Sequence, residues 1–163
     1  MNYTFVKSPI GQLLLAGERG KLMHLGFQSG PKARGADPEW EREDGLFVEA
    51  KRQLDAYFDG TLREFELELA PAGTNFQRQV WRALLEIPFG ETVSYGDLAR
   101  QIGNPKAVRA VGGANGANPI AIVQPCHRVI GSSGGLTGFG GGLDVKRALL
   151  EHESHRSGLF ASS

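Results

Sequence analysis

The sequence predicts a mixed α/β (α+β) protein with a strand-rich N-terminal part and a mostly helical C-terminal part. Short apolar runs between turn residues fill the start of the chain, whereas apolar residues recur at helical spacing after residue 74. The formal charge also differs: residues 1–73 carry a net −3 and residues 74–163 a net +3, although all 163 residues sum to zero. Pro71-Ala72-Gly73 lies at this change and disfavours regular structure, so we expect two domains, 1–73 and 74–163.

The N-terminal part contains three short apolar runs separated by turn residues, which predict an antiparallel meander. The polar stretch Ser29–Asp44 is typical of an exposed loop. Apolar residues return at helical spacing over Asp44–Phe58, and Gly60 can end that helix. Charged and apolar residues alternate over Arg63–Leu69, which predicts one more strand. The three runs are Tyr3–Lys7, Gln12–Gly17 and Lys21–Phe27.

Two helices of the C-terminal part have recognisable ends. Thr74 and Gln77 have the spacing of a capping box and begin a helix whose apolar stripe extends to Glu86. The last helix is expected over Leu143–Glu153. A carboxylate at the C-terminus of a helix opposes the helix dipole. Glu153 therefore either has a partner such as His or Arg or is an ordinary surface residue.

Between these helices, the sequence predicts two shorter helices joined by a turn. Ser94 with Asp97 can cap the first, and Asn104-Pro105 can open the second, Lys106–Asn115. This order is typical of a helix-turn-helix in which the second helix is the recognition helix, although an ordinary helical hairpin has the same pattern. The second helix is rich in Ala and Gly, which permits close approach to DNA or to another helix.

The chain has one cysteine, Cys126, which follows Pro125 and precedes His127 and Arg128. Cationic neighbours favour the thiolate, the nucleophilic form, so this group is a candidate for covalent catalysis. The alternative is a small buried apolar residue, which is a common role of a free cysteine. Seven of the residues in Gly131–Gly142 are glycine, which predicts a flexible loop or one that lies close to a ligand.

The composition excludes several classes of protein. A single cysteine excludes an intramolecular disulfide and a cysteine-cluster zinc site, and it fits a reducing, cytoplasmic setting. The sequence has no apolar run of about 18 residues that would predict a transmembrane helix. Its first residues lack the pattern of a signal peptide. The net charge does not by itself indicate a nucleic-acid partner, although the C-terminal half leans that way.

Four motifs occur in order between Phe76 and Glu153. They are Val93-Ser94-Tyr95-Gly96, Arg109-Ala110-Val111-Gly112-Gly113-Ala114, Asn118-Pro119 with Ile122-Val123-Gln124-Pro125-Cys126-His127-Arg128-Val129-Ile130, and Gly141-Gly142-Leu143 with Leu149-Leu150 and His152-Glu153. Together they resemble the O6-alkylguanine-DNA alkyltransferases, also called methylated-DNA–protein-cysteine methyltransferases. Residues 1–73 match this family loosely, through the Pro9-Ile10-Gly11 turn. The resemblance implies a small ribonuclease-H-like domain with an antiparallel sheet and a helix, followed by a helical DNA-binding domain.

The resemblance also implies direct-reversal DNA repair. A damaged guanine is flipped out of double-stranded DNA, and its O6-alkyl group moves to Cys126 as a stable thioether, so each molecule reacts once. O4-alkylthymine would be a further lesion of this kind. The family needs no cofactor, and the zinc site of some relatives is not expected because His24 is the only His of residues 1–73. We expect a cytoplasmic monomer that has no membrane partner.

Five residues would form the reaction centre, by their positions in the family motifs. Cys126 would be the nucleophile, His127 would act through a water as its base, and Glu153 would orient His127. Tyr95 would hydrogen-bond the flipped base and help to protonate the departing guanine. Asn118 would hold the active-site turn.

The resemblance places the recognition helix in the minor groove of DNA, where readout carries little sequence information. Arg109 would enter the base stack and fill the gap left by the flipped nucleotide. Arg128 would brace the fold beside the site. Further DNA contacts would be Ala110, Gly113, Ala114, Asn115 and Tyr95, and the substrate pocket would include Val129, Phe139 and Gly140.

Three residues depart from the pattern of the family. Gln124 is polar where an apolar residue is usual, so it either forms a hydrogen bond or is strained. Phe139 stands in place of a common Tyr, and Gly140 in place of a common Ser or Ala. Because Gly140 can enlarge the pocket, we expect tolerance of alkyl groups bulkier than methyl.

Other functions fit part of the pattern. A damage-sensing relative would bind DNA without transfer, but such relatives lack the cysteine that Cys126 provides. A cysteine hydrolase would need an oriented base and an oxyanion hole, for which the glycine-rich loop could offer backbone N–H groups. A stand-alone transcription factor would need side chains that read the major groove, and the recognition helix is poor in them.

Overall fold

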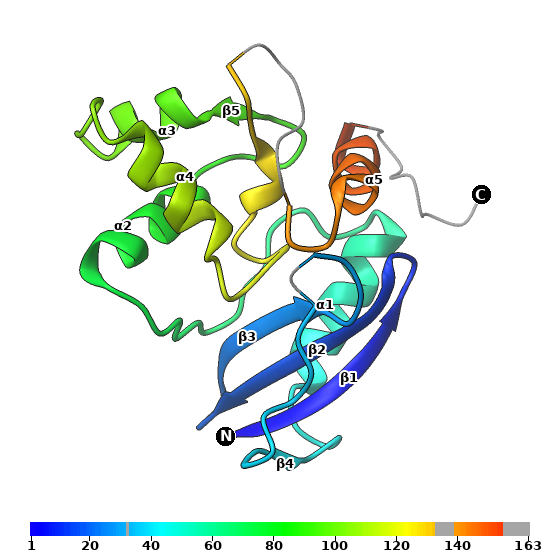
Figure 1. Ribbon diagram of the computed structural model, residues 1–163. Helices are drawn as coiled ribbons and strands as arrows, with labels where there is room; N and C mark the ends of the chain where they lie inside the picture. Colours follow the sequence, from blue (N-terminus) through cyan, green and yellow to red (C-terminus); the bar gives the residue numbers. More distant parts are fainter. Residues whose placement is uncertain (32, 133–138, 155–163) are drawn as a thin grey trace.

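A computed structural model describes residues 1–31, 33–132 and 139–154 of the chain (Figure 1). The N-terminal part is a four-stranded sheet in the order β3-β2-β1-β4, followed by one helix, α1 (Val48–Asp59). β1 pairs antiparallel with β2 and β2 with β3, which confirms the expected meander. The strands are β1 (Asn2–Ser8), β2 (Gly11–Glu18), β3 (Lys21–Phe27) and β4 (Glu41–Arg42), of which β4 runs parallel to β1.

The C-terminal part is mostly helical and lies at the other end of the molecule from β1 and β2 (Figure 1). Both predicted capping boxes are present, at Thr74 with Gln77 and at Ser94 with Asp97. Each box satisfies backbone N–H groups that the first turn of a helix leaves without partners. The elements are α2 (Asn75–Leu84), β5 (Val93–Ser94), α3 (Tyr95–Gln101), α4 (Val108–Gly116), the 3-10 turn η1 (Cys126–Arg128), β6 (Val129–Ile130) and α5 (Leu143–Ser154).

The prediction of a strand over Arg63–Leu69 is wrong. This segment pairs with the sheet at one isolated β-bridge, between Leu69 and Leu22 of β3. Upstream, the side chain of Gln53 on α1 takes the place of a neighbouring strand: it accepts from Glu66 N at 2.8 Å and donates to Glu66 O at 3.0 Å. Because these backbone groups are already satisfied, the alternation in the sequence produces no ladder here.

Two helices begin later than predicted. α1 begins at Val48, after Phe47, which has a left-handed φ of 60°. α4 begins at Val108, because Ala107 N donates to Asn104 O at 3.0 Å and closes a separate turn around Pro105. The expected glycine-rich loop lies partly outside the described residues, at 133–138, and the C-terminal tail lies outside them from 155 onward.

Two apolar cores hold the fold, and the first of them draws residues from both sides of residue 73. The first core lies between the sheet and α1, but it also contains Ile120–Val123 and Leu149 from the C-terminal part. The second core lies among α2, α3 and α4 and includes Cys126 and Val129. The segment before the cysteine is therefore anchored in the N-terminal core, and the cysteine itself in the other.

Candidate active site

Cys126 begins the short turn η1 and has 7% of its surface exposed. The turn that leads to it is tied by Asn118, whose Nδ2 donates to Gln124 O at 2.7 Å and whose Oδ1 accepts from Ile120 N at 3.1 Å. Gln124 Nε2 also donates to Asn118 Oδ1, at 2.7 Å. The polar Gln124 is thus hydrogen-bonded, and Asn118 lies where it can fix the path of the active-site turn.

The same turn contains a strained residue, Ile122, at a φ of 72°. A left-handed conformation is uncommon for a β-branched residue and costs about 1–3 kcal/mol, so it persists where the surroundings enforce it. Strand β3 provides part of that restraint: Leu25 N donates to Pro119 O at 2.9 Å, and Ala121 N donates to Leu25 O at 3.0 Å. The N-terminal sheet therefore positions the backbone that carries Cys126.

Glu153, at the end of α5, is a buried carboxylate held by three side chains. It accepts from Tyr57 Oη at 2.6 Å and from His127 Nε2 at 2.7 Å. Arg128 donates to it from Nε at 2.7 Å and from Nη2 at 3.0 Å. Burial by itself would raise the pKa of Glu153, but hydrogen bonds from His127 and Arg128, together with the charge of Arg128, outweigh burial and hold that pKa well below its usual range. Glu153 is therefore ionised.

His127 is completely buried, and burial lowers its pKa, although Glu153 opposes this effect. Burial therefore favours the neutral form of the imidazole. Because a carboxylate can only accept, the proton of the neutral ring lies on Nε2, which faces Glu153. His127 Nδ1 is then an acceptor, and it has no hydrogen-bond partner among the described residues.

Two buried groups at this site were not among the residues expected from the sequence. Tyr57, from α1, donates to Glu153, as described above. Lys146, from α5, is fully buried, and its Nζ donates to Val129 O at 2.8 Å. Burial lowers the pKa of Lys146, and the charge of Cys126 opposes that shift. The sequence gives one indication that Lys146 is buried: it precedes the core residue Leu149 by about one helical turn, so the two lie on the same face of α5.

Cys126 opens into a pocket of about 90 Å3 that residues from both parts of the chain line. Phe139 and Gly140, expected in the pocket, are among these residues, whereas Val129 lies in the core behind Cys126. Strand β3 contributes a complete wall that the sequence did not indicate. The lining residues are His24, Leu25, Gly26, Phe27, Asn115, Gly116, Asn118, Ala121, Cys126, Phe139 and Gly140.

The residues of helix α4 that were expected to contact DNA fall into an exposed group and a buried group. Arg109, Ala110 and Gly113 are exposed. Ala114 and Asn115 are buried. The carbonyl of Ala114 accepts from Trp81 Nε1 at 2.8 Å, and Asn115 Nδ2 donates to Cys126 O at 3.4 Å. Ala114 and Asn115 thus contact the interior of the C-terminal part, Ala114 at Trp81 and Asn115 at Cys126.

Tyr95 begins α3 and is half-buried beside α4, where its ring lies next to Gly112. It is absent from the residues that line the Cys126 pocket. Its packing against α4 places it close to the helix that carries Arg109.

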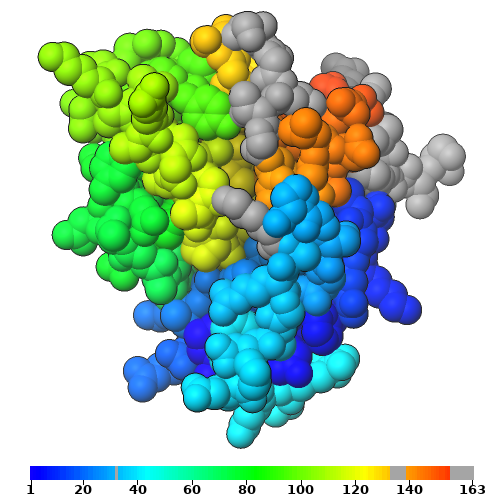
Figure 2. Space-filling view, viewed as in Figure 1, coloured from blue at the N-terminus to red at the C-terminus, as the bar shows by residue number. Residues whose placement is uncertain are grey.

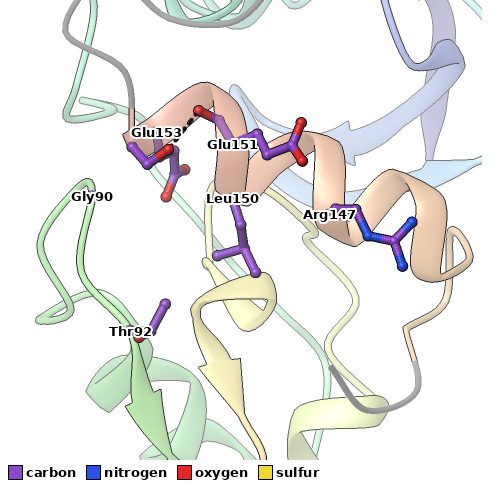
Figure 3. Close-up of a pocket in the computed structure, with 7 residues that line it drawn as sticks. Gly90, Thr92, Arg147, Leu150, Glu151 and Glu153 are labelled. Carbon is purple, nitrogen blue, oxygen red and sulfur yellow. Dashed lines mark hydrogen bonds between the residues drawn. The ribbon is translucent and has the colours of Figure 1, made fainter. Parts of the chain in front are cut away.

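A larger pocket, of about 280 Å3, lies on the outer side of α5. Figure 3 shows it between the Gly90–Thr92 loop and α5, with Leu150 pointing toward Thr92. Cys126 does not line this pocket. Its larger size therefore does not by itself make it a candidate for the site of reaction with the thiol.

The described residues place no three His, Cys, Asp or Glu side chains together in a way that could hold a metal ion. In the same residues, no helix is both long enough and apolar enough to cross a bilayer.

Comparison with known proteins identifies the family. The ribonuclease-like domain of 6-O-methylguanine DNA methyltransferase matches residues 1–71, and the DNA-binding domain of the same family matches residues 75–155. The methylated-DNA–protein-cysteine methyltransferase of Methanosarcina acetivorans is 54% identical over 94% of this chain and 98% of its own length. That of Mycobacterium tuberculosis (strain H37Rv) is 54% identical over 96% of this chain and 94% of its own.

Solved structures agree with these matches. The crystal structure of Mycobacterium tuberculosis OGT in complex with DNA has a TM-score of 0.92 and 52% identity, covering 98% of this chain and 97% of that one. The O6-methylguanine methyltransferase structure from the same organism has a TM-score of 0.88 and 53% identity, covering 97% of this chain and 95% of that one. The chain belongs to the 6-O-methylguanine DNA methyltransferase family.

Proposed function

We propose that Cys126 is the alkyl acceptor of a single-turnover DNA-repair reaction on O6-alkylguanine. As a member of its family, the chain is a methylated-DNA–protein-cysteine methyltransferase that repairs DNA by direct reversal. The observation that carries the assignment to Cys126 is its place at a small pocket, next to the buried cluster of His127, Arg128 and Glu153. No other thiol occurs in the sequence.

The reaction is a displacement at carbon. The Cys126 thiolate attacks the alkyl carbon, a C–S bond forms, and the bond from that carbon to O6 of guanine breaks. The electron pair of the broken bond stays on the guanine, which takes up a proton and becomes an ordinary base. The thioether product is stable to water, so the protein is consumed in proportion to the lesions repaired.

His127 is the proposed base for the thiol. Its Nδ1 is the acceptor of the neutral ring, and a water between the two residues could carry the proton from Cys126 to it. The imidazolium formed in this way would face the carboxylate of Glu153 at 2.7 Å. Glu153 therefore holds the ring in the useful tautomer and stabilises its charged form.

The charges buried around the thiol also favour the thiolate. Arg128 compensates the carboxylate of Glu153, and the buried ammonium of Lys146 donates to the backbone carbonyl of Val129. Lys146 and Cys126 attract one another when both are charged. The buried cation therefore favours the thiolate of Cys126 over the thiol.

The exposed face of α4 is the proposed contact with double-stranded DNA. Arg109 is exposed there and would occupy the gap left by the flipped base, while the small residues Ala110 and Gly113 permit close approach to the minor groove. Tyr95, beside α4, would reach the flipped base. Support comes from the likeness to the Mycobacterium tuberculosis protein in complex with DNA.

Intact mass spectrometry tests the proposal. The protein is mixed with a duplex oligonucleotide that carries one O6-methylguanine, and we expect the mass of one methyl group to be added, with no more than one per molecule. Cys126→Ser is the matched variant and should gain no mass. Tight binding to the same duplex without any gain of mass in the unaltered protein would instead indicate a damage sensor.

A further inference from the structure

Strand β3 closes the side of the Cys126 pocket that faces the N-terminal part. His24, Leu25, Gly26 and Phe27 all line the pocket, although they precede the cysteine by about a hundred residues in the sequence. The backbone of β3 is fixed by pairing with β2, in which Phe27 lies opposite Leu13. Although β3 is an edge strand of the sheet, its ladder with β2 holds this wall more firmly than a surface loop would be held.

Phe27 is the bulky member of this wall. Its side chain is buried, and its ring meets that of Phe139 edge to face, with the ring centroids 5.5 Å apart. The backbone at Gly141 lies so close to the ring that an added Cβ would stand 3.0–3.1 Å from three of the ring atoms. The Phe27 ring is therefore held on one side by its strand and on the other by the segment that leads into α5.

The chain after β3 continues this contact. A Cβ at Gly30 would lie 2.8 Å from the backbone carbonyl of Gly141, and one at Gly142 would lie 3.8 Å from Pro31. Figure 2 shows the segment after β3, in light blue, against the orange start of α5. Phe27 and the segment from Phe139 to Gly142 are thus packed against one another, which restrains the two phenylalanine rings that line the pocket.

The volume of the pocket indicates which alkyl groups it can hold. An apolar cavity of about 150 Å3 accommodates benzene. The Cys126 pocket is about 90 Å3, so it has room for a methyl or ethyl group, but a benzyl group needs Phe27 or Phe139 to move. The absence of a side chain at Gly140 does not by itself provide that room, because Phe27 and Phe139 still close the pocket.

We propose that Phe27, from the N-terminal sheet, is a specificity-determining residue that limits the alkyl group transferred to Cys126 to a small one. The inference rests on the proposed transfer to Cys126 and goes beyond it by assigning the length of the pocket to a residue outside the catalytic cluster. Shortening the Phe27 side chain lengthens the pocket, and enlarging it shortens the pocket. Phe27 does not touch the reacting atoms, so its substitution changes the selectivity among alkyl groups more than the chemistry of methyl transfer.

Single-turnover rates with duplexes that carry O6-methyl-, O6-ethyl- or O6-benzylguanine test this proposal. We expect Phe27→Leu to raise the benzyl-to-methyl rate ratio by about tenfold or more, the effect of a change in pocket size by one or two methylenes. Phe27→Trp should lower the ethyl-to-methyl ratio by about the same factor. The matched control is Phe58→Leu, since Phe58 is 5% exposed, against 8% for Phe27, and does not line the pocket. Its ratios should equal those of the unaltered protein.

Unchanged ratios in both Phe27 variants, with methyl transfer intact, would overturn the proposal and leave Cys126 as the acceptor. An unaltered protein that takes no methyl group would instead overturn the proposed function. Melting curves identify variants that fail to fold. Should Phe27→Leu be one of them, Phe27→Met replaces it, because the flexible methionine side chain fills an irregular gap, and it is expected to raise the benzyl-to-methyl ratio in the same direction.

Discussion

The substitution Glu153→Gln keeps the size of the side chain but removes its charge. The carboxylate accepts hydrogen bonds from Tyr57, from His127 and twice from Arg128, all between 2.6 and 3.0 Å. A glutamine amide supplies one oxygen for these donors and turns an NH2 group toward the others. Arg128 would keep its charge in a buried site, and such a loss of one partner costs about 3–5 kcal/mol.

Urea unfolding followed by tryptophan fluorescence measures this cost. Glu151→Gln is the matched control, because Glu151 is exposed on the same helix, and its change should stay within about 0.5 kcal/mol. A loss below about 1 kcal/mol in Glu153→Gln would refute the view that this carboxylate is needed to compensate the buried charge of Arg128.

The pH dependence of the unfolding free energy provides a second test with the same substitution. The pKa of Glu153 is lower in the folded state than its ordinary value of 4.5, so its contribution to stability is present above about pH 4.5 and is lost as the pH falls through the folded pKa. The difference in unfolding free energy between the unaltered protein and Glu153→Gln should therefore shrink as the pH is lowered from 6 toward 3, as measured by urea unfolding at each pH. A difference that stays constant over this range would contradict an ionised Glu153.

Three further predictions concern the thiol and the DNA-binding face. Lys146→Met should slow the alkylation of Cys126 by iodoacetamide about tenfold at neutral pH, because a neighbouring cation favours the thiolate, while Lys146→Arg should keep most of the rate. Arg109→Ala should slow methyl transfer from duplex DNA by about tenfold or more without changing the iodoacetamide rate, since Arg109 is exposed on α4; an equal fall in both rates would argue against a role in base flipping. Methylation of Cys126 removes the charge that attracts Lys146 and should lower Tm by roughly 2–4 °C, which corresponds to about 1 kcal/mol; equal melting curves for the two forms would contradict this.

Local patterns predicted most of the regular structure. Both capping boxes could be identified because a side-chain oxygen and a backbone N–H three residues later interact within one turn. The prediction of a strand over Arg63–Leu69 was wrong because its outcome depended on a contact with a distant part of the chain. In this segment the backbone of Glu66 bonds to the side-chain amide of Gln53, which lies on α1. The alternating pattern of the sequence contains no information about that long-range contact.

The sequence could also identify the chemistry of the site, because the functional residues occur in compact motifs. Cys126, His127 and Arg128 are consecutive, and the unfavourable place of Glu153 at a helix end indicated that it could have a cationic partner. Motif positions did not distinguish exposed from buried residues on α4. Asn115, expected on the DNA, is buried against the carbonyl of Cys126.

By itself, the sequence predicted the order of the main helices and strands, the family and the candidate nucleophile, because these depend on residues that are close together along the chain. Only the tertiary structure decided what surrounds the thiol. Tyr57 and Phe27 reach the site from the N-terminal part, and Lys146 is buried beneath it from α5. Packing brings these residues together across long separations, and burial then fixes both the charge balance and the length of the pocket, neither of which a local pattern can encode.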